Sequence, residues 1–171
     1  KFKNDSIVKI AKKETKNNEI PYYSNYYKRD KQNYNCKLNK KIELNSCDTI
    51  DLYLLRGIGW VYAKRILKYR NLLGGFINKE QLLEVYGMDK NRYNLFSNDV
   101  YVDTSKIKKI NINDNNLDIR ILGKHPYIGF KKAYKIINYR KKNGPYSNIL
   151  QLLNVIDTNE YLKISKYIDV K

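Results

Sequence analysis

The chain has 171 residues, of which 34 are lysine or arginine and 17 are acidic, so its formal net charge is +17 at pH 7. An apolar content of 42% can supply a buried core, which excludes a fibrous protein. No run reaches the roughly 18 to 20 apolar residues of a membrane span, and the charge favours a polyanion, nucleic acid before anionic membrane, as partner.

Residues 1–41 form the most basic part of the chain, with 12 basic and 4 acidic side chains. Aliphatic periodicity is weak in this segment, so we expect a flexible basic arm. Aromatic rings among cations can stack on nucleic-acid bases, although a merely solvated linker would have the same composition. The rings in question are Tyr22, Tyr23, Tyr26, Tyr27 and Tyr34.

The two cysteines and the one histidine do not have the spacing of a metal site. Cys36 and Cys47 lack a CxxC pattern, and His125 stands alone before Pro126, where we expect a turn residue and not a catalytic base. We therefore expect no metal and no cofactor. A disulfide and two free thiols both remain open, and the compartment therefore remains open as well. The given sequence begins with no apolar signal core.

The remainder of the chain is a duplication. A shift of 70 residues places 58–85 on 128–155 with 12 identities in 28 positions, against about two expected by chance. We divide the chain into an arm at 1–41, a first domain at 42–102, a linker at 103–109 and a second domain at 110–171.

Each copy is expected to be a set of short helices. Both begin with an extended Ile-x-(Leu/Ile)-Asn, in which Asn45 or Asn113 could cap a first helix. Gly74 has the position of a left-handed helix stop. Asn78 and Gln81 have the spacing of a capping box for a third helix over 79–85, and a last helix is expected to run to about residue 96. The pattern predicts an all-α fold.

The stretch Leu55–Ile66, LRGIGWVYAKRI, contains the most informative turn. A connection of two or three residues between helices tends to need positive φ, which Gly57 and Gly59 supply without strain. The missing Cβ atoms also let a phosphate approach the first free amides of the next helix. Ile58 is expected to point into the core and hold the turn. Lys64 and Arg65 would add mobile cations.

This stretch and its surroundings resemble the helix-hairpin-helix domain of ComEA-type competence DNA receptors and related bacterial proteins. The likeness rests on the Ile-x-Leu-Asn entry, the G-I-G hairpin, Ile-x-x-Tyr-Arg and Gly-Gly-Phe, and it extends over about 42–171. It implies two tandem helix-hairpin-helix (SAM-like) domains that bind double-stranded DNA through phosphate without sequence preference. In such proteins a membrane anchor often precedes the domains.

The candidate phosphate-binding residues come from the first turn and from its counterpart in the second copy. They are Arg56, Gly57, Ile58, Gly59, Trp60, Val61, Lys64 and Arg65, together with Ile128, Gly129, Lys131 and Lys132.

Three of the four hairpins depart from the family pattern. The second copy has Tyr127 at the position of Gly57, Asp89 stands where the later hairpin of the first copy should have glycine, and Asp157-Thr158-Asn159 has no glycine. An acid in this place would repel phosphate. The more regular turn also lies in the less basic copy, because residues 42–102 carry a net charge of +1 and residues 110–171 a net charge of +6.

Catalysis has little support, since no acidic side chain stands where a base-excising enzyme built on this hairpin would need one. We expect a non-enzymatic DNA-binding protein. A protein-interaction or scaffold module, in which the degenerate hairpins serve only for packing, is the alternative. Salt-sensitive binding to random duplex DNA separates the two.

Overall fold

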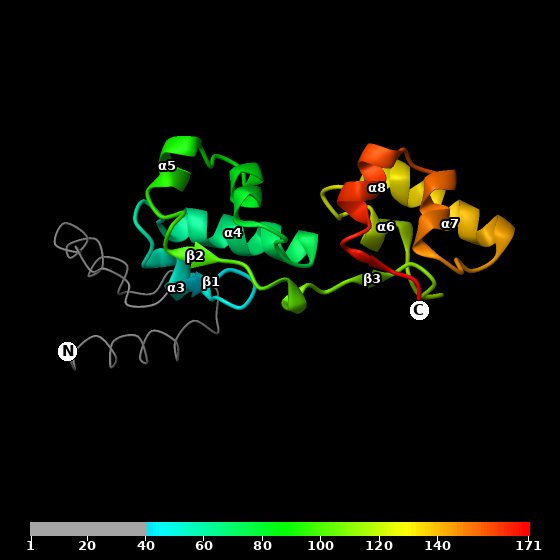
Figure 1. The fold of residues 1–171 in the computed structure, drawn as a ribbon, viewed down its shortest axis with the longest axis horizontal. Coiled ribbons are helices and arrows are strands. Elements are labelled where there is room, and N and C mark those ends of the chain that lie inside the picture. The colour runs from blue at the N-terminus through cyan, green and yellow to red at the C-terminus, as the bar shows by residue number, and fades with distance from the viewer. Residues whose placement is uncertain (1–40) are drawn as a thin grey trace.

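The computed structural model of the chain describes residues 41–171, which form two similar helical units that follow one another along the chain (Figure 1). All but one residue of the predicted basic arm, and Cys36, lie outside the described residues. None of the described helices has the length and apolar character needed to cross a membrane.

The two units contain the same elements in the same order. The first consists of strand β1 (Ile42–Glu43), helices α3 (Thr49–Tyr53) and α4 (Trp60–Leu73), the 3-10 helix η2 (Lys79–Glu84), helix α5 (Lys90–Asn94) and strand β2 (Val100–Tyr101). After the 3-10 helix η3 (Thr104–Lys106), the second consists of β3 (Ile110–Asn111), α6 (Ile119–Leu122), α7 (Gly129–Asn143), η4 (Ile149–Asn154), α8 (Thr158–Ile164) and β4 (Ile168–Asp169).

The helical prediction is confirmed, with one addition to each unit. The extended entry of each copy pairs in parallel with the end of that copy, Ile42 beside Val100 and Ile110 beside Ile168. These pairs are very short, so each unit closes on itself without acquiring a real sheet.

The two copies are related by two different sequence offsets. The offset of 70 residues found in the sequence relates the 3-10 helices, which begin at Lys79 and Ile149. A register shorter by two positions relates the paired strands and the last helices, since α5 begins at Lys90 and α8 at Thr158. The second copy has therefore gained two residues before α6 and lost two before α8, relative to the first.

The helix ends follow the predicted chemistry in part. Gly74 has φ 84° and ψ 2° and ends α4 in the left-handed conformation, and Asn78 forms the expected capping box with Gln81. The expectation that Asn45 and Asn113 cap helices is wrong. Asp48 caps α3 by accepting from the Ile50 and Asp51 amides, and Asp118 caps α6.

Asn45 instead clamps its unit together. Its side chain donates to the carbonyl of Phe76 at 2.9 Å and accepts from the amide of the same residue at 2.6 Å, as one strand residue would do with another. Asn113 makes the equivalent pair of bonds with Tyr146, at 2.9 and 2.8 Å. In both units the entry segment is thereby tied to the loop that follows the long helix.

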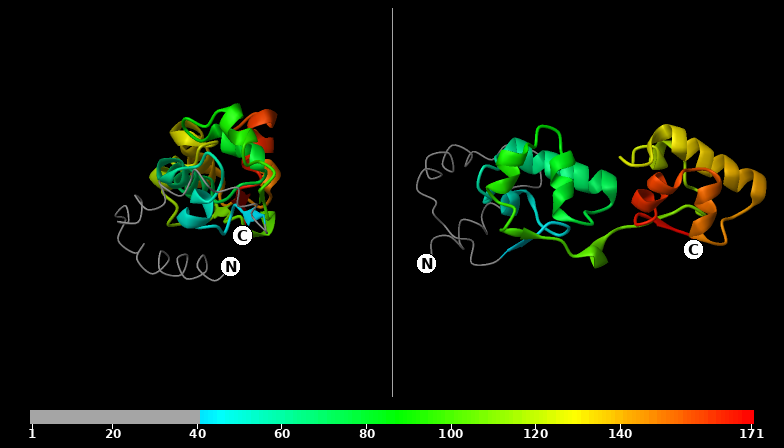
Figure 2. Two further views of the ribbon diagram at one scale, coloured as in Figure 1. Left: turned by 90° about the vertical axis from the view of Figure 1, so that its left-hand side faces the viewer. Right: turned by 45° about the horizontal axis from the view of Figure 1, so that its top comes forward.

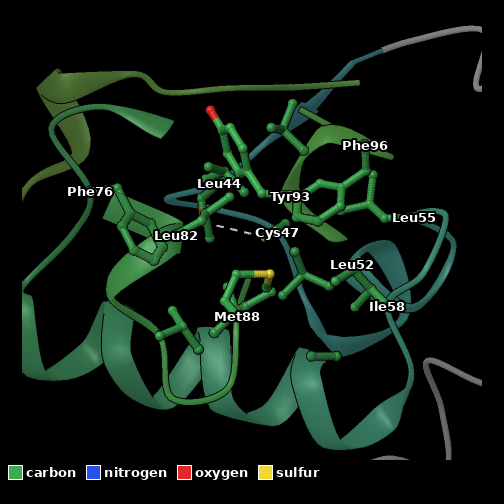
Figure 3. Close-up of a cluster of buried hydrophobic side chains, with 14 of the residues drawn as sticks. Leu44, Cys47, Leu52, Leu55, Ile58, Phe76, Leu82, Met88, Tyr93 and Phe96 are labelled. Carbon is green, nitrogen blue, oxygen red and sulfur yellow. Dashed lines mark hydrogen bonds between the residues drawn. The ribbon is translucent and has the colours of Figure 1, made fainter. Parts of the chain in front are cut away.

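The core of the first unit gathers side chains from all its elements (Figure 3). Leu52, Leu55 and Ile58 are fully buried there. Cys47 is a free thiol in the same core, and burial raises its pKa to about 12, so it stays protonated at neutral pH.

The chain between β2 and β3 is bound to the first unit as it crosses to the second (Figure 2). Glu43 accepts from the Asp103 amide at 3.0 Å and pairs with Lys106 at 3.2 Å, and the Lys108 amide donates to Gly74 at 2.8 Å. Burial alone would raise the pKa of Glu43, but these hydrogen bonds and those from Ser46 and the Asn45 amide lower it to about 2.

Candidate nucleic-acid interface

The first hairpin joins α3 to α4, and its two glycines have different tasks. Gly57 has φ +78°, and a Cβ there would lie 2.9 Å from Cδ1 of Leu95, which follows α5. Its carbonyl accepts a 2.8 Å hydrogen bond from Arg92 on the same helix. Positive φ is thus required at Gly57 only, because Gly59 has an extended backbone with φ −103° and ψ 177°.

Gly59 is the N-cap of α4, and no side chain caps this helix. Its carbonyl accepts from the Ala63 amide at 2.9 Å, while a Cβ built on Gly59 meets nothing within 4 Å. The helix has 14 residues, so its first amides and its dipole present a partial positive charge to an open approach. This arrangement can hold a phosphate oxygen.

The neighbouring candidate residues divide into anchors and exposed groups. Ile58 is fully buried, as predicted (Figure 3). Trp60 stacks on Tyr53 with ring centroids 4.9 Å apart. Three further candidates lie at the surface, and they are Arg56, Val61 and Lys64, although Arg56 and Lys64 alone carry charge.

Arg65 is held in place, in contrast to the mobile cation that the sequence suggested. It donates to the Tyr86 carbonyl at 3.0 Å, and its guanidinium lies over the rings of Tyr86 and Tyr62 at 4.8 and 5.3 Å. The guanidinium of Arg92 also packs on Tyr62, 4.2 Å from the ring centroid. The two hairpins of the unit are therefore connected through stacked cations and rings.

The second hairpin of the first unit repeats the first further along the chain. Gly87 has φ +80°, and its carbonyl accepts from Tyr62 at 2.9 Å, just as the carbonyl of Gly57 accepts from Arg92. Asp89 has φ −107° and ψ 165°, nearly the backbone of Gly59. Its carboxylate accepts from the Arg92 amide at 2.8 Å, so this helix start already holds an anion of its own.

The corresponding hairpin of the second unit is closed in the same way. Asp157 caps α8 by accepting from the Glu160 amide at 2.8 Å. In the shorter register of this part of the repeat, Asp157 matches Asp89 and the buried Ile156 matches Met88. The alignment of Asp157-Thr158-Asn159 with the glycine turn is therefore wrong by two positions.

The hairpin before α7 lacks the first glycine and has a different turn. Gly129 has φ +64°, and its amide donates to the His125 carbonyl at 3.0 Å. Ile128 is buried, and Lys131 is exposed. Lys132 pairs with Glu160 at 2.8 Å, which neutralises one of the two predicted cations.

Tyr127, the residue that replaces the first glycine, contacts the other unit. Its hydroxyl lies 2.9 Å from both carboxylate oxygens of Glu84 and 2.6 Å from the amide nitrogen of Gln81. Gln81 also donates to the hydroxyl of Tyr167 at 2.8 Å, and Tyr167 is fully buried in the core cluster of the first unit. Burial, opposed by the bond from Gln81 but reinforced by Glu84, raises the pKa of Tyr127, so the hydroxyl stays protonated.

His125 completes this contact between the units. It is 2% exposed, and its Nε2 lies 3.1 Å from the Leu73 carbonyl at the end of α4, while Nδ1 accepts from the Tyr127 amide. The ring is therefore neutral, with its proton on Nε2. Burial lowers its pKa to about 4, although the bond to Leu73 acts in the opposite direction.

These features define a class of protein: a tandem of helical units, each built from two consecutive hairpins, in which the long helices α4 and α7 begin without a side-chain cap. The chain belongs to the helix-hairpin-helix family, because the family model described as helix-hairpin-helix motif matches residues 38–100 and 105–168. Such motifs typically bind DNA without sequence specificity. The matches include no catalytic domain.

Comparison with individual proteins adds no closer relative. No curated protein matches the chain. No solved structure matches it either.

Proposed function

We propose that the chain binds double-stranded DNA without sequence preference and without catalysis, chiefly at the helix start of Gly59. The observation that carries the proposal is the contrast between Gly59 and Asp89. The two helix starts have nearly the same backbone geometry, but only one has a side-chain cap. Asp89 caps its helix with its own carboxylate, whereas Gly59 leaves the free amides of α4 accessible to another anion. A DNA phosphate is the anion that a strongly basic protein meets.

The exposed cations support the same proposal. Arg56 and Lys64 flank the open helix start, and contacts of amides and cations with phosphate position a protein on DNA without reading bases. In this proposal the other candidates have supporting tasks: Gly57 and Ile58 hold the turn, Trp60 and Val61 supply amides, and Arg65 braces the two hairpins.

We further propose that the protein is of the ComEA type. Its domains would be residues 42–102 and 110–171, with a linker at 103–109. No metal and no cofactor takes part. In the second unit we assign Ile128, Gly129, Lys131 and Lys132 a minor share, because the Gly129 amide and the Lys132 ammonium already have partners.

A scaffold role is the second candidate, and one observation favours it. The hairpin turn at Tyr127 contacts Glu84 and Gln81 of the first unit, so at least one degenerate hairpin serves packing. This packing contact joins two parts of the same chain. We would propose a scaffold role toward other proteins only if the chain failed to bind duplex DNA.

Gly59→Asp tests the proposal, since it converts the open helix start into a copy of Asp89. The new carboxylate should cap α4 and leave stability equal or a few tenths of a kcal/mol higher. Affinity for a random-sequence duplex, measured by fluorescence anisotropy at two salt concentrations, should fall about tenfold, and the log-log salt slope should lose about 0.9.

Asn71→Asp is the matched control, because it makes the same change of charge at an exposed residue near the other end of α4. It should weaken binding by less than about twofold at moderate salt, through the general field alone. Equal losses in the two variants would refute phosphate binding at the helix start of Gly59. Absence of duplex binding by the unaltered chain would favour the scaffold role.

A further inference from the structure

One side of α7 in the second unit exposes large apolar rings. Phe130 and Tyr134 are each 58% exposed, and they stand four positions apart, so they lie on the same side of the helix. Ile121 of the neighbouring helix α6 is 56% exposed. These three exposed apolar side chains contribute little to the core. Exposed apolar patches of this kind are typical of interaction sites.

The first unit has no such surface at the matching positions. Trp60, which corresponds to Phe130, stacks on Tyr53, and Lys64 corresponds to Tyr134. In the second unit Gly123 stands at the position of Tyr53, and a Cβ there would lie 2.6 Å from Cδ1 of Phe130. Phe130 thus rests against a residue without a side chain, and its outer surface stays free.

The charge around these rings is positive. Lys124, Lys131 and Lys135 are exposed. The ion pairs within this unit use other cations, Arg120 with Asp118, Lys132 with Glu160 and Lys171 with Asp169, and the carboxylate of Asp157 caps α8. Three exposed lysines beside two exposed rings form a surface that attracts a polyanion with flat apolar parts.

We infer that this α7 face binds single-stranded nucleic acid, with bases stacked on Phe130 and Tyr134 and phosphates beside the lysines. Every base offers a ring face, so such a platform needs no sequence. The rings are separated by about 6 Å along the helix axis, close to two base steps of about 3.4 Å. Bases in a closed duplex are stacked on one another and expose no such face.

The inference goes beyond duplex binding and does not depend on it. It also accounts for the distribution of charge, since the unit with the poorer hairpin turn is the more basic one, at +6 against +1. The two units would then bind two forms of nucleic acid, which suits a junction between duplex and single strand.

The double variant Phe130→Ala with Tyr134→Ala, in the full chain, tests the inference. Affinity for a fluorescently labelled thymidine oligonucleotide of about 20 residues should fall at least tenfold, since each stacked base contributes about that much. Affinity for the random duplex should change by less than about twofold. Tyr101→Ala, which removes an exposed ring of the first unit, is the matched control and should leave both affinities unchanged.

Tyr134→Ala alone serves if the double variant fails to fold, because Tyr134 is separate from the contact between Phe130 and Gly123. Unchanged oligonucleotide binding by the folded variants would overturn the inference. So would a loss seen on anionic phospholipid vesicles and not on the oligonucleotide, which would assign the face to a membrane surface. Gly59→Asp should leave oligonucleotide binding intact, which separates failure of this inference from failure of the duplex proposal.

Discussion

Gly59 and Asp89 occupy equivalent helix starts, and they differ in the source of the negative charge that the helix receives. Asp89 satisfies the Arg92 amide with its own carboxylate. Gly59 has no side chain to offer, so its helix gains from any bound anion. In our proposal, a difference of one side chain therefore separates a structural hairpin from one that binds phosphate.

Asp89→Gly is the reverse experiment and should open a second helix start. Because Asp89 has the backbone of Gly59, glycine fits without strain, and stability should fall by a few tenths of a kcal/mol. Duplex affinity should rise about threefold, and the salt slope should increase by up to about 0.9. Asp114→Asn removes a charge at an exposed residue away from any helix start. An equal rise in that variant would show that net charge alone is responsible.

The helix ends also mark the limit of sequence reasoning about the site. The glycines, the buried Ile58 and the exposed lysine at position 64 could be predicted, because a short turn constrains φ, volume and solvation. In the sequence Asp89 and Asp157 predict only a charge that repels phosphate, because nothing there shows that each carboxylate caps its own helix. A single offset for the whole repeat also conceals the shorter register around Asp157. In the sequence Tyr127 stands out only as a missing glycine, because its contacts with Glu84 and Gln81 join residues that are more than 40 positions apart.

At the level of elements, each unit is closed by one asparagine. Asn45 binds both backbone groups of Phe76 and also donates to Asp103 at 3.0 Å. Asn113 binds both backbone groups of Tyr146. These long-range bonds, more than the short helices themselves, hold the start of each unit against its middle. Arginines at matching positions of the two long helices reinforce the same entry segments, Arg70 through the Leu44 carbonyl and Arg140 through the Ile112 carbonyl.

Asn45→Ala should destabilise the first unit by about 2 kcal/mol, because it leaves the Phe76 amide without its acceptor. Thermal unfolding followed by circular dichroism measures the loss. Asn115→Ala, at an exposed residue, should have an effect below about 0.5 kcal/mol. A loss of similar size in the two variants would mean that the clamp contributes little.

Much of this element pattern could be predicted. Helical spacing, Gly74 and the box of Asn78 and Gln81 located the helices correctly, because caps and stops depend on neighbours in sequence. The parallel strand pairs could not be predicted, because a strand of two residues shows no alternation of apolar and polar side chains. Its partner also lies at the far end of the unit. The sequence predicted a helix at η2 and η4 but not its 3-10 form, because packing and not helix propensity decides that form.

At the level of the whole molecule, the contact between the units depends on a neutral histidine. His125 lies against Tyr127 and Tyr167, with ring centroids 5.9 and 4.9 Å away, and its Nε2 meets the Leu73 carbonyl. Among the described residues no carboxylate is bonded to the ring, so the carbonyl alone opposes the effect of burial on its pKa. The groups that face this contact from the first unit are Gln81, Glu84 and, through its bond to Glu84, Tyr69.

Acid should therefore separate the two units. A free histidine takes up a proton near pH 6.5, whereas the docked ring has a pKa of about 4. Docking is fully favoured above pH 6.5 and weakens as the pH falls towards 4, by up to about 3 kcal/mol. Small-angle scattering should show an increase in radius of gyration over this range, before the helices melt.

His125→Gln is the control, because its amide can still donate to Leu73 but does not titrate. Its radius of gyration should vary less between pH 6.5 and 4 than that of the unaltered chain. An identical response would assign the effect to another group, with Glu84 the first to consider, since it receives the Tyr127 hydroxyl.

In our proposal both units bind nucleic acid, and the docking of Tyr127 would then affect how long the protein remains bound. Two binding faces on a flexible tether meet a second site only as often as the tether allows, and their effective concentration falls as the tether lengthens. Here the hydroxyl of Tyr127 and the ring of His125 hold the units together, so little conformational entropy is lost when the second face engages. A docked pair should therefore rebind after one face has released, and slow dissociation would arise from contacts that never touch nucleic acid.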